Sequence, residues 1–500
     1  MKFQMKLLCA AALLGLLPQT AFATDEAAKS APAPVTEYTA NKAEKRLSGT
    51  FGGQRVNYTA TVAEQVLKDD KGNPKAAIVT TTYIAEPNDP SRPVTFLFNG
   101  GPGSASLWLQ LGAFGPKRVA IPSDAKDDGA PPYPILDNPD SLLDVTDLVF
   151  IDPVGTGFSH VIGDTKPSDY YGMDQDATSV AQVIRQWLSE HDRWNSPKFL
   201  GGESYGTTRS ALVAGKLEND YNDVALNGVI LISAILDFAA VWGDEGSDVS
   251  YVSYVPNMAA AALYHGKASA PSLEQFVAEA RAFAIGPYAT ALLKGQALPE
   301  TEKAAVRRDL ARFSGLSEAY LDRANLRVSP DRYYKELLRD RGLTIGRLDA
   351  RYTGVDIDNA GESPDNDPSF YGIDGGYTAA ANDWFRRTLG YKTERDYSPI
   401  GGVGAWDWRP AGEGSVATYL NVAPTLGRAM RENSDLRVFV GQGYYDFATP
   451  FLAAEQSLNR PGIPQDRIAF EYYGSGHMMY VRDEDRQKLS RDVRAFIRAR

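Results

Sequence analysis

The sequence predicts an α/β fold with a mostly parallel central sheet, helices on both faces of the sheet and a mainly helical insertion. Three observations predict it. Short apolar runs of strand length alternate with helical and glycine-rich segments. Polar motifs follow directly after several of these runs, where ligands bind at the carboxyl ends of parallel strands. One long block of helical runs and polar loops breaks the alternation.

The first 46 residues are expected to lie outside this fold. A positively charged start precedes the apolar stretch 7–17, and Ala21-Phe22-Ala23 has the small-x-small pattern of a cleavage site. Residues 1–23 are therefore predicted to be a signal peptide, and residues 24–46 a flexible leader. We expect an exported protein that acts in the periplasm or outside the cell.

The composition is that of an ordinary globular protein, with 500 residues, 43% apolar residues and a net charge of −11. No cluster of basic residues suggests a nucleic acid partner, and no later segment has the length of a membrane anchor. The only cysteine, Cys9, lies in the predicted signal peptide. The exported protein should therefore lack disulfides and a cysteine nucleophile. No metal or cofactor is predicted, and the oligomeric state is left open.

A β-hairpin is predicted to begin the folded region, with strands near 56–67 and 77–84 and a turn at Asp69–Asn73. Six core strands are predicted, at Val94–Phe98, Leu148–Ile151, Phe199–Leu200, Val229–Ile232, Val438–Val440 and Ile468–Tyr472. A helix is predicted between the second and third of them, from apolar residues at helical spacing: Val180, Val183, Ile184, Trp187 and Leu188.

Residues 238–426 are predicted to form a mainly helical cap, which divides the core into residues 47–237 and residues 427–500. Its helical runs are Leu273–Phe283, Glu302–Phe313, Leu316–Arg323 and Arg332–Arg339. Such an insertion between two sheet strands is placed to cover the mouth of an active site.

A candidate nucleophile is Ser204, in Gly202-Glu203-Ser204-Tyr205-Gly206 after a predicted strand. The glycines allow a tight turn from strand to helix that exposes the serine hydroxyl. A serine hydroxyl is a weak nucleophile and needs a neighbouring base. His477 suits this role best of the four histidines, because it lies in a glycine-rich loop after a strand. The others are His160, His191 and His265.

Asp446 follows another predicted strand and is a candidate to orient the base. Its alternative interpretation is a turn or helix cap before Thr449-Pro450. The chain order of serine, aspartate and histidine is the order found in hydrolases built on this kind of sheet.

Asn99-Gly100-Gly101-Pro102-Gly103 follows the first core strand. Acyl transfer needs donors for a developing oxyanion, and the backbone N–H groups of Gly101 and Tyr205 are the candidates. Alone, this segment would be interpreted as a simple turn.

Four motifs together resemble the serine carboxypeptidases, in a variant typical of a bacterial branch. They are Asn99-Gly-Gly-Pro-Gly, Asp152-Pro-Val-Gly-Thr-Gly-Phe-Ser159, Gly202-Glu-Ser204-Tyr-Gly and Gly476-His477-Met478. The resemblance implies an α/β-hydrolase fold with a helical cap and the removal of C-terminal residues from peptides. It supports the triad of Ser204, Asp446 and His477, and an oxyanion hole at Gly101 and Tyr205.

The resemblance also implies that Asn99 and Glu203 hold the carboxylate of the substrate. A glutamate kept protonated can donate a hydrogen bond to a carboxylate, so activity on peptides should fall as the pH rises. Two positions differ from the family pattern: Ala113 replaces a second glutamate, and Ser104 replaces a cysteine. The first difference weakens the case for a raised pKa at Glu203.

Other functions remain open at this stage. An esterase or acyltransferase could use the same scaffold, and a non-catalytic binding protein could have the same hydrolase fold. The acidic segment Asp356–Asp367 is favoured as a solvated loop over a calcium loop. Trp406-Asp407-Trp408 could line a substrate pocket or simply pack within the insertion.

Overall fold

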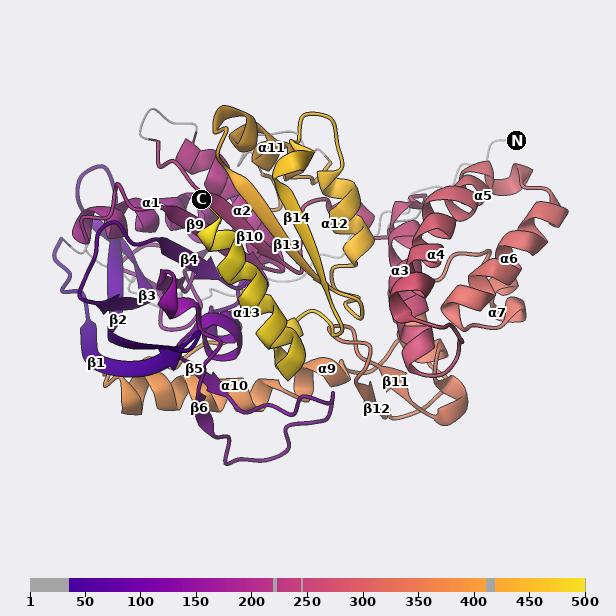
Figure 1. Ribbon diagram of the computed structural model, residues 1–500, viewed down its shortest axis with the longest axis horizontal. Coiled ribbons are helices and arrows are strands. Elements are labelled where there is room, and N and C mark those ends of the chain that lie inside the picture. Colours follow the sequence, from indigo (N-terminus) through magenta and orange to yellow (C-terminus); the bar gives the residue numbers. More distant parts are fainter. Residues whose placement is uncertain (1–35, 219–222, 244–245, 411–418, 500) are drawn as a thin grey trace, which may run out of the picture.

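The computed structural model describes residues 36–218, 223–243, 246–410 and 419–499. The predicted signal peptide and residues 24–35 of the predicted leader lie outside the described residues. None of the helices in the described ranges is long and apolar enough to cross a bilayer. Figure 1 shows a core built on one sheet, with a lobe of helices at one side.

In the described ranges, ten strands form one sheet in the order β1-β2-β3-β7-β4-β9-β10-β13-β14, with β8 paired to β3 (Figure 1). The strands are β1 Lys42–Phe51, β2 Gln54–Lys68, β3 Pro74–Glu86, β4 Val94–Phe98, β7 Asp147–Ile151, β8 His160–Val161, β9 Lys198–Glu203, β10 Gly228–Ile232, β13 Arg437–Gly443 and β14 Ile468–Tyr473. The run from β7 to β14 is parallel, and β1, β2 and β3 form an antiparallel end. The predicted hairpin and all six predicted core strands are confirmed.

Two hydrophobic cores lie on opposite faces of the sheet. Strand β10 shows the division, because Val229 and Leu231 enter one core while Ile230 and Ile232 enter the other. Alternate side chains of a strand point to opposite faces, and here both faces are covered. This explains why the parallel strands appear in the sequence as continuous apolar runs.

Helices cover both faces, as predicted. One face is covered by α1 (Met173–Glu190), α2 (Tyr205–Glu218) and α11 (Ala423–Glu432). The other is covered by α13 (Asp483–Arg498), by a π-helical turn at Leu109–Phe114 and by part of the insertion. The helix predicted from the residues around Val180 is α1, and it buries that apolar face.

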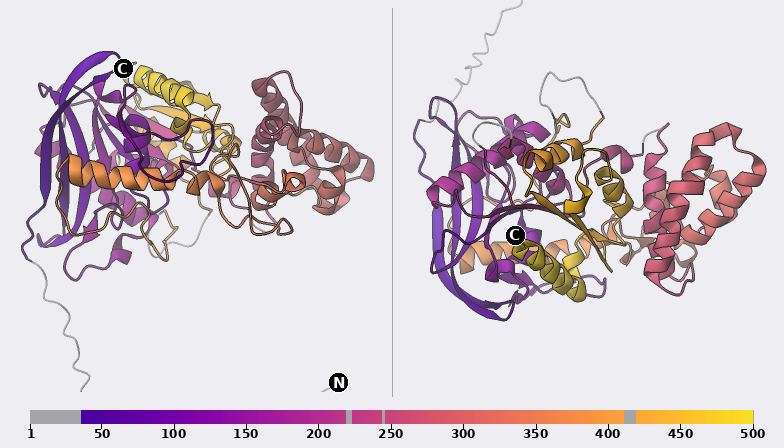
Figure 2. Two further views of the ribbon diagram at one scale, coloured as in Figure 1. Left: turned by 90° about the horizontal axis from the view of Figure 1, so that it is seen from below. Right: turned by 45° about the horizontal axis from the view of Figure 1, so that its top comes forward.

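The insertion has two parts. Its helices are α3 Val249–Tyr264, α4 Leu273–Phe283, α5 Ala289–Lys294, α6 Glu300–Ser314, α7 Glu318–Arg323, α8 Pro330–Glu336, α9 Pro368–Tyr371 and α10 Asp374–Asn382. Helices α3 to α7 form the lobe beside α12 (Phe451–Leu458), whereas α9 and α10 run back along the core (Figures 1 and 2). Two short antiparallel pairs accompany them: β5 (Lys117–Val119) with β6 (Ile135–Asp137), and β11 (Thr344–Ile345) with β12 (Thr353–Gly354).

The structure corrects two predicted boundaries and the extent of the predicted cap. The leader does not extend to residue 46, because β1 begins at Lys42 and pairs with β2. The cap does not extend to residue 426, because α11 packs on α2 in the core. Nor is the whole of 238–426 a cap, since Tyr377 and Trp384 are buried in the core beneath the sheet. In all three places the chain passes from one packing partner to another, and the amino-acid composition of the segment does not reveal the change.

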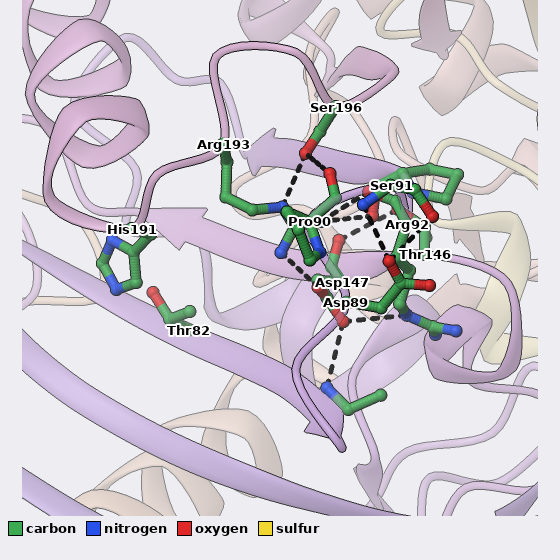
Figure 3. A network of polar contacts seen from close by, with 12 residues as sticks. Thr82, Asp89, Pro90, Ser91, Arg92, Thr146, Asp147, His191, Arg193 and Ser196 are labelled. Atoms are coloured by element: carbon green, nitrogen blue, oxygen red, sulfur yellow. Dashed lines mark hydrogen bonds and ion pairs between the residues drawn. The ribbon is translucent and has the colours of Figure 1, made fainter.

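A buried network of charges fixes the starts of the parallel strands (Figure 3). Asp147, the first residue of β7, accepts hydrogen bonds from Arg193 Nη1 at 2.7 Å and Arg92 Nε at 2.9 Å. Arg193 also donates to Ser196 Oγ at 2.6 Å, just before β9. Arg193 and Asp147 are fully buried. The network braces β4, β7 and β9 at the end opposite to the polar motifs.

Candidate active site

Ser204 lies at the sharp turn between β9 and α2, as predicted. Its φ of +60° is in the left-handed region, which is strained for a residue with a side chain. The turn is held by a hydrogen bond from Ser204 N to the Ile232 carbonyl at 3.0 Å. A Cβ at Gly202 would lie 2.0 Å from the Gly206 carbonyl oxygen, so the first glycine is required by close packing.

A cavity of about 180 Å³ opens at the carboxyl ends of the strands beside this turn. Five of the seven predicted site residues line it: Asn99, Gly101, Glu203, Ser204 and His477. The insertion contributes Arg347, Leu348, Phe370 and Ile400 to the same lining. Asp446 is fully buried behind His477, and the side chain of Tyr205 packs elsewhere.

His477 and Asp446 form a close pair. His477 Nδ1 lies 2.8 Å from Asp446 Oδ2. Thr449 Oγ1 donates to the same oxygen at 2.6 Å, while Asp446 Oδ1 accepts the backbone N–H groups of Ala448 and Thr449 at 2.8 and 3.0 Å. The two sequence interpretations of Asp446 are therefore compatible: one oxygen caps the turn, and the other holds the imidazole.

The pKa of the buried His477 side chain is raised. Burial, the largest influence, acts to lower this pKa, but the charge of Asp446 and its hydrogen bond raise it by more. The same carboxylate would stabilise an imidazolium formed when the base takes a proton. Among the described residues, the hydroxyl of Ser204 makes no hydrogen bond. In unliganded sites such bonds are often long and tighten when substrate binds.

The Gly100–Gly103 loop rests directly on the serine turn. A Cβ at Gly100 would lie 2.5 Å from the backbone N of Tyr205, and Gly101 has a φ of +100°. Within the described ranges, the N–H groups of Gly101 and Tyr205 donate to no backbone or side-chain acceptor. The insertion supports the loop through a hydrogen bond from Gly401 N to the Gly103 carbonyl at 2.7 Å. Two candidate oxyanion donors are thus brought to one place.

Glu203 lies in a buried polar cluster beside the cavity. Tyr480 donates its hydroxyl to Glu203 Oε2 at 2.7 Å. Burial raises the pKa of Glu203 to about 7, although the nearby His477 and the hydrogen bonds from Tyr480 and Asn99 act to lower it. Asn99 itself is fixed, because its Oδ1 accepts the backbone N–H of Leu109 at 3.0 Å. The raised pKa expected for Glu203 is therefore present despite Ala113.

Tyr480 is a site residue that sequence reasoning missed. Ala113 is buried and has no carboxylate to share a proton with Glu203. Tyr480 instead holds the glutamate, from a position three residues after His477. This short spacing to the candidate base was the available signal, but an aromatic residue there is equally typical of a core. Arg347 was also missed, since it lies in the middle of the insertion.

The other sequence candidates lie away from the cavity. His191 stacks on Trp187 with ring centroids 4.2 Å apart, His265 Nε2 lies 2.7 Å from the Ala350 carbonyl, and His160 lies next to Tyr38. Trp406 and Trp408 pack edge-on against Tyr205 of the core, so they contribute to the packing between the insertion and the core. Asp356 pairs with Lys335, and no group of acidic, histidine or cysteine residues in the described chain is arranged to hold a metal ion.

The strand order, together with a strained turn that presents Ser204 at the top of the sheet, defines an α/β-hydrolase. Residues 81–263 match the family model described as serine carboxypeptidase. This part of the chain is therefore similar to the serine carboxypeptidase family, in agreement with the resemblance of its motifs.

Two plant relatives are similar to part of the chain. The chain is 30% identical to serine carboxypeptidase-like 45 of Arabidopsis thaliana over 167 residues, 31% of this chain and 32% of that protein. It is 31% identical to serine carboxypeptidase-like 44 of the same plant over 128 residues, 24% of each protein. The chain thus matches a third or less of the length of these relatives.

Two solved structures are more distant. The structure of VinJ has a TM-score of 0.37 at 13% identity, over 86% of this chain and 98% of that one. A monoglyceride lipase variant from Saccharomyces cerevisiae has a TM-score of 0.35 at 12% identity, over 87% of this chain and 94% of that one.

Proposed function

We propose that this protein is a serine carboxypeptidase, which removes C-terminal residues from peptides through an acyl-enzyme at Ser204. His477 takes the proton of the Ser204 hydroxyl as Oγ attacks the scissile carbonyl carbon. His477 then gives the proton to the amine, which leaves as the peptide bond breaks. In the second half, water attacks the acyl-enzyme and gives a proton to His477, which passes it to Ser204 Oγ as the ester bond breaks. Asp446 orients His477, and the N–H groups of Gly101 and Tyr205 bind the oxyanion.

One observation carries this proposal. The hydrogen bond between His477 Nδ1 and Asp446 Oδ2 at 2.8 Å commits one ring nitrogen to the carboxylate. The other nitrogen, Nε2, is then the one available to a reacting group in the cavity that Ser204 also lines. A base, its orienting carboxylate and a strained serine at the ends of three different strands are what acyl transfer requires.

Recognition of the peptide end is assigned to Asn99 and Glu203. With its pKa raised to about 7, Glu203 is protonated in mildly acidic solution and can donate a hydrogen bond to a terminal carboxylate. Both residues line the cavity next to Ser204, so the carboxylate and the scissile bond could be held together.

The triad is tested with a fluorophosphonate probe. We expect the wild-type protein to be labelled at Ser204, and the Ser204→Ala variant, which retains the turn, to remain unlabelled. His477→Ala should slow labelling by at least about 10²-fold, since the hydroxyl loses its base. A folded wild-type protein that resists the probe would favour the non-catalytic alternative.

The substrate class is tested with a mixed pool of peptides followed by mass spectrometry. Stepwise loss of C-terminal residues, absent from Ser204→Ala, is the expected result. Hydrolysis of simple esters with the peptides left intact would instead assign the esterase or acyltransferase function.

We also propose that the enzyme is exported to the periplasm or beyond the cell. The charged start, the apolar stretch and the small residues at Ala21 and Ala23 support this. Sequencing of the N-terminus of the secreted protein should begin at Thr24, and a chain that retains Met1 in the cytoplasm would contradict it.

A further inference from the structure

Arg347 is a cation at the edge of the candidate active site. Its side chain is exposed, and it lines the same cavity as Ser204 and His477. Among the described residues that line this cavity, it is the only arginine or lysine. Its guanidinium makes no hydrogen bond or ion pair with the described part of the chain. An unpaired arginine in a binding cavity is poised for an anion from outside the protein.

The neighbouring arginines differ in this respect. Arg351, four residues further along, is buried and pairs with Asp349 at 2.6 Å. Arg332 pairs with Glu362 at 2.8 Å even though both are exposed. A shortage of carboxylates therefore does not explain the free guanidinium of Arg347. Its surroundings leave the side chain directed to the cavity and to solvent.

The backbone of Arg347 is fixed on both sides. Its N–H donates to Asp367 Oδ1 at 3.0 Å, and its carbonyl accepts the N–H of Phe447 at 3.1 Å, next to Asp446. The following carbonyl, that of Leu348, accepts the N–H of His477 at 2.7 Å. The guanidinium is thus attached to a segment that is aligned with the candidate base and its orienting residue.

Arg347 is also separate from Glu203, which is assigned to bind the C-terminal carboxylate of the peptide. Glu203 is hydrogen-bonded to Tyr480 and makes no ion pair with Arg347. The charge of Arg347 acts instead on His477, as a smaller influence beside burial and Asp446. The cavity therefore holds two separate groups able to bind carboxyl groups, one at Glu203 and one at Arg347.

We propose that Arg347 binds an acidic side chain of the substrate, so that the enzyme prefers peptides with Asp or Glu next to the scissile bond. The guanidinium fork matches a carboxylate and donates two parallel hydrogen bonds to it. This inference rests on the peptidase function proposed above, and it goes further by assigning a class of side chain.

The test compares two short peptides that are blocked at the N-terminus and differ only in carrying Glu or Gln at one position. That variable position is placed in turn on each side of the scissile bond. Arg347→Gln should lower kcat/KM for the preferred Glu peptide by about 10- to 100-fold, as for loss of a charge-assisted hydrogen bond, and leave the Gln peptide within about threefold. Arg347→Lys should restore part of the preference. Arg308→Gln, at an exposed residue of α6 without a partner among the described residues, is the matched control and should change neither.

Three results would overturn the proposal. The wild-type enzyme could cleave the Glu and Gln peptides equally well in both positions. Arg347→Gln could slow both peptides equally, which would mean contact with the terminal carboxylate or an effect on His477. Finally, Ser204→Ala could bind the two peptides with equal affinity by calorimetry. This last measurement needs no turnover, so it separates failure of this inference from failure of the peptidase function.

Discussion

Burial and hydrogen bonding act in opposite directions on the carboxyl group of Glu203. Burial dominates and raises its pKa to about 7, while the hydroxyl of Tyr480 and the amide of Asn99 favour the charged form. The group is therefore neutral in acid and becomes charged as the pH rises through neutrality. A charged Glu203 would repel the carboxylate that it is proposed to bind.

The first prediction concerns this titration. For the wild-type enzyme, kcat/KM on peptides should fall as the pH rises through about 7, because the raised pKa of Glu203 is crossed there. Glu203→Gln retains an amide donor but cannot ionise, so its profile should lack this decline and keep only the rise that follows deprotonation of His477. Hydrolysis of an uncharged ester by the wild type is the control. An identical decline in the variant would contradict the assignment.

A second prediction isolates Tyr480. Tyr480→Phe removes a hydrogen bond that lowers the pKa of Glu203, so the decline in kcat/KM should move upward by about one pH unit. Tyr333→Phe provides a buried tyrosine far from Glu203, whose hydroxyl donates to the Met258 carbonyl at 2.8 Å. That variant should leave the profile in place, and a downward shift in Tyr480→Phe would refute the reasoning.

The chemistry of single residues was predictable where it follows from local spacing. Ser204 is identified by glycines two residues away on either side, and the structure places it at the expected turn. Asp446 and His477 each follow an apolar run, and the structure brings them within hydrogen-bond distance. Arg347 reaches the site through contacts between distant segments, which no local pattern encodes, and the short spacing of Tyr480 to His477 does not by itself reveal its contact with Glu203.

At the scale of elements, the two ends of the parallel strands carry different kinds of residue. The carboxyl ends carry Asn99, Ser204 and the other candidate site residues, whereas the amino ends are joined by the buried pair of Asp147 and Arg193. A buried charge is costly without its partner, since it has already lost its water. The candidate site therefore lies at one end of strands whose opposite ends are held by the buried ion pair of Asp147 and Arg193.

Asp147→Asn should therefore lower the free energy of unfolding by about 3–5 kcal/mol, because Arg193 and Arg92 are left without a carboxylate. Urea unfolding measures this, and kcat/KM of the folded variant should remain unchanged. Asp383→Asn, which removes an exposed pair with Arg387, is the control and should stay within about 0.5 kcal/mol. Equal losses in the two variants would refute the role of the network.

Strands buried on both faces were easier to predict than elements at the margins. Val229–Ile232 is apolar throughout because it contacts both cores, and it was located to within a residue. The first half of strand β1, residues 42–46, was assigned to the leader because β1 is an edge strand with mostly exposed or half-buried side chains. Helix α10 was assigned to the cap because its sequence does not reveal which surface it covers.

At the scale of the whole molecule, the insertion and the core share the candidate active site. Residues 347–350 of the insertion contact the loops of both Asp446 and His477. Asp349 Oδ2 accepts the N–H of Gly476 at 3.0 Å, and Ala350 N donates to the Tyr445 carbonyl at 3.0 Å. The loops of the second core part that carry Asp446 and His477 are therefore supported from outside the core.

Catalysis and global structure should consequently be lost together. In a urea titration, the rate of fluorophosphonate labelling and the far-ultraviolet circular dichroism should fall with the same midpoint. Asp349→Ala should separate them, with labelling lost at lower urea, because the acceptor for Gly476 is gone. Asp340→Ala, in the insertion but paired at the surface with Lys267, is the control. Separate midpoints in the wild type would contradict this coupling.

The way in which Arg347 is anchored has a further consequence for how this enzyme could diversify. Within the described residues, residue 347 is tied to Phe447 and to the side chain of Asp367 through its own main-chain atoms, so its side chain can be exchanged without moving the proposed reactive groups. Substrate choice and catalytic competence are then separable by mutation. Position 347 is a natural starting point for libraries that retarget the enzyme to other peptides.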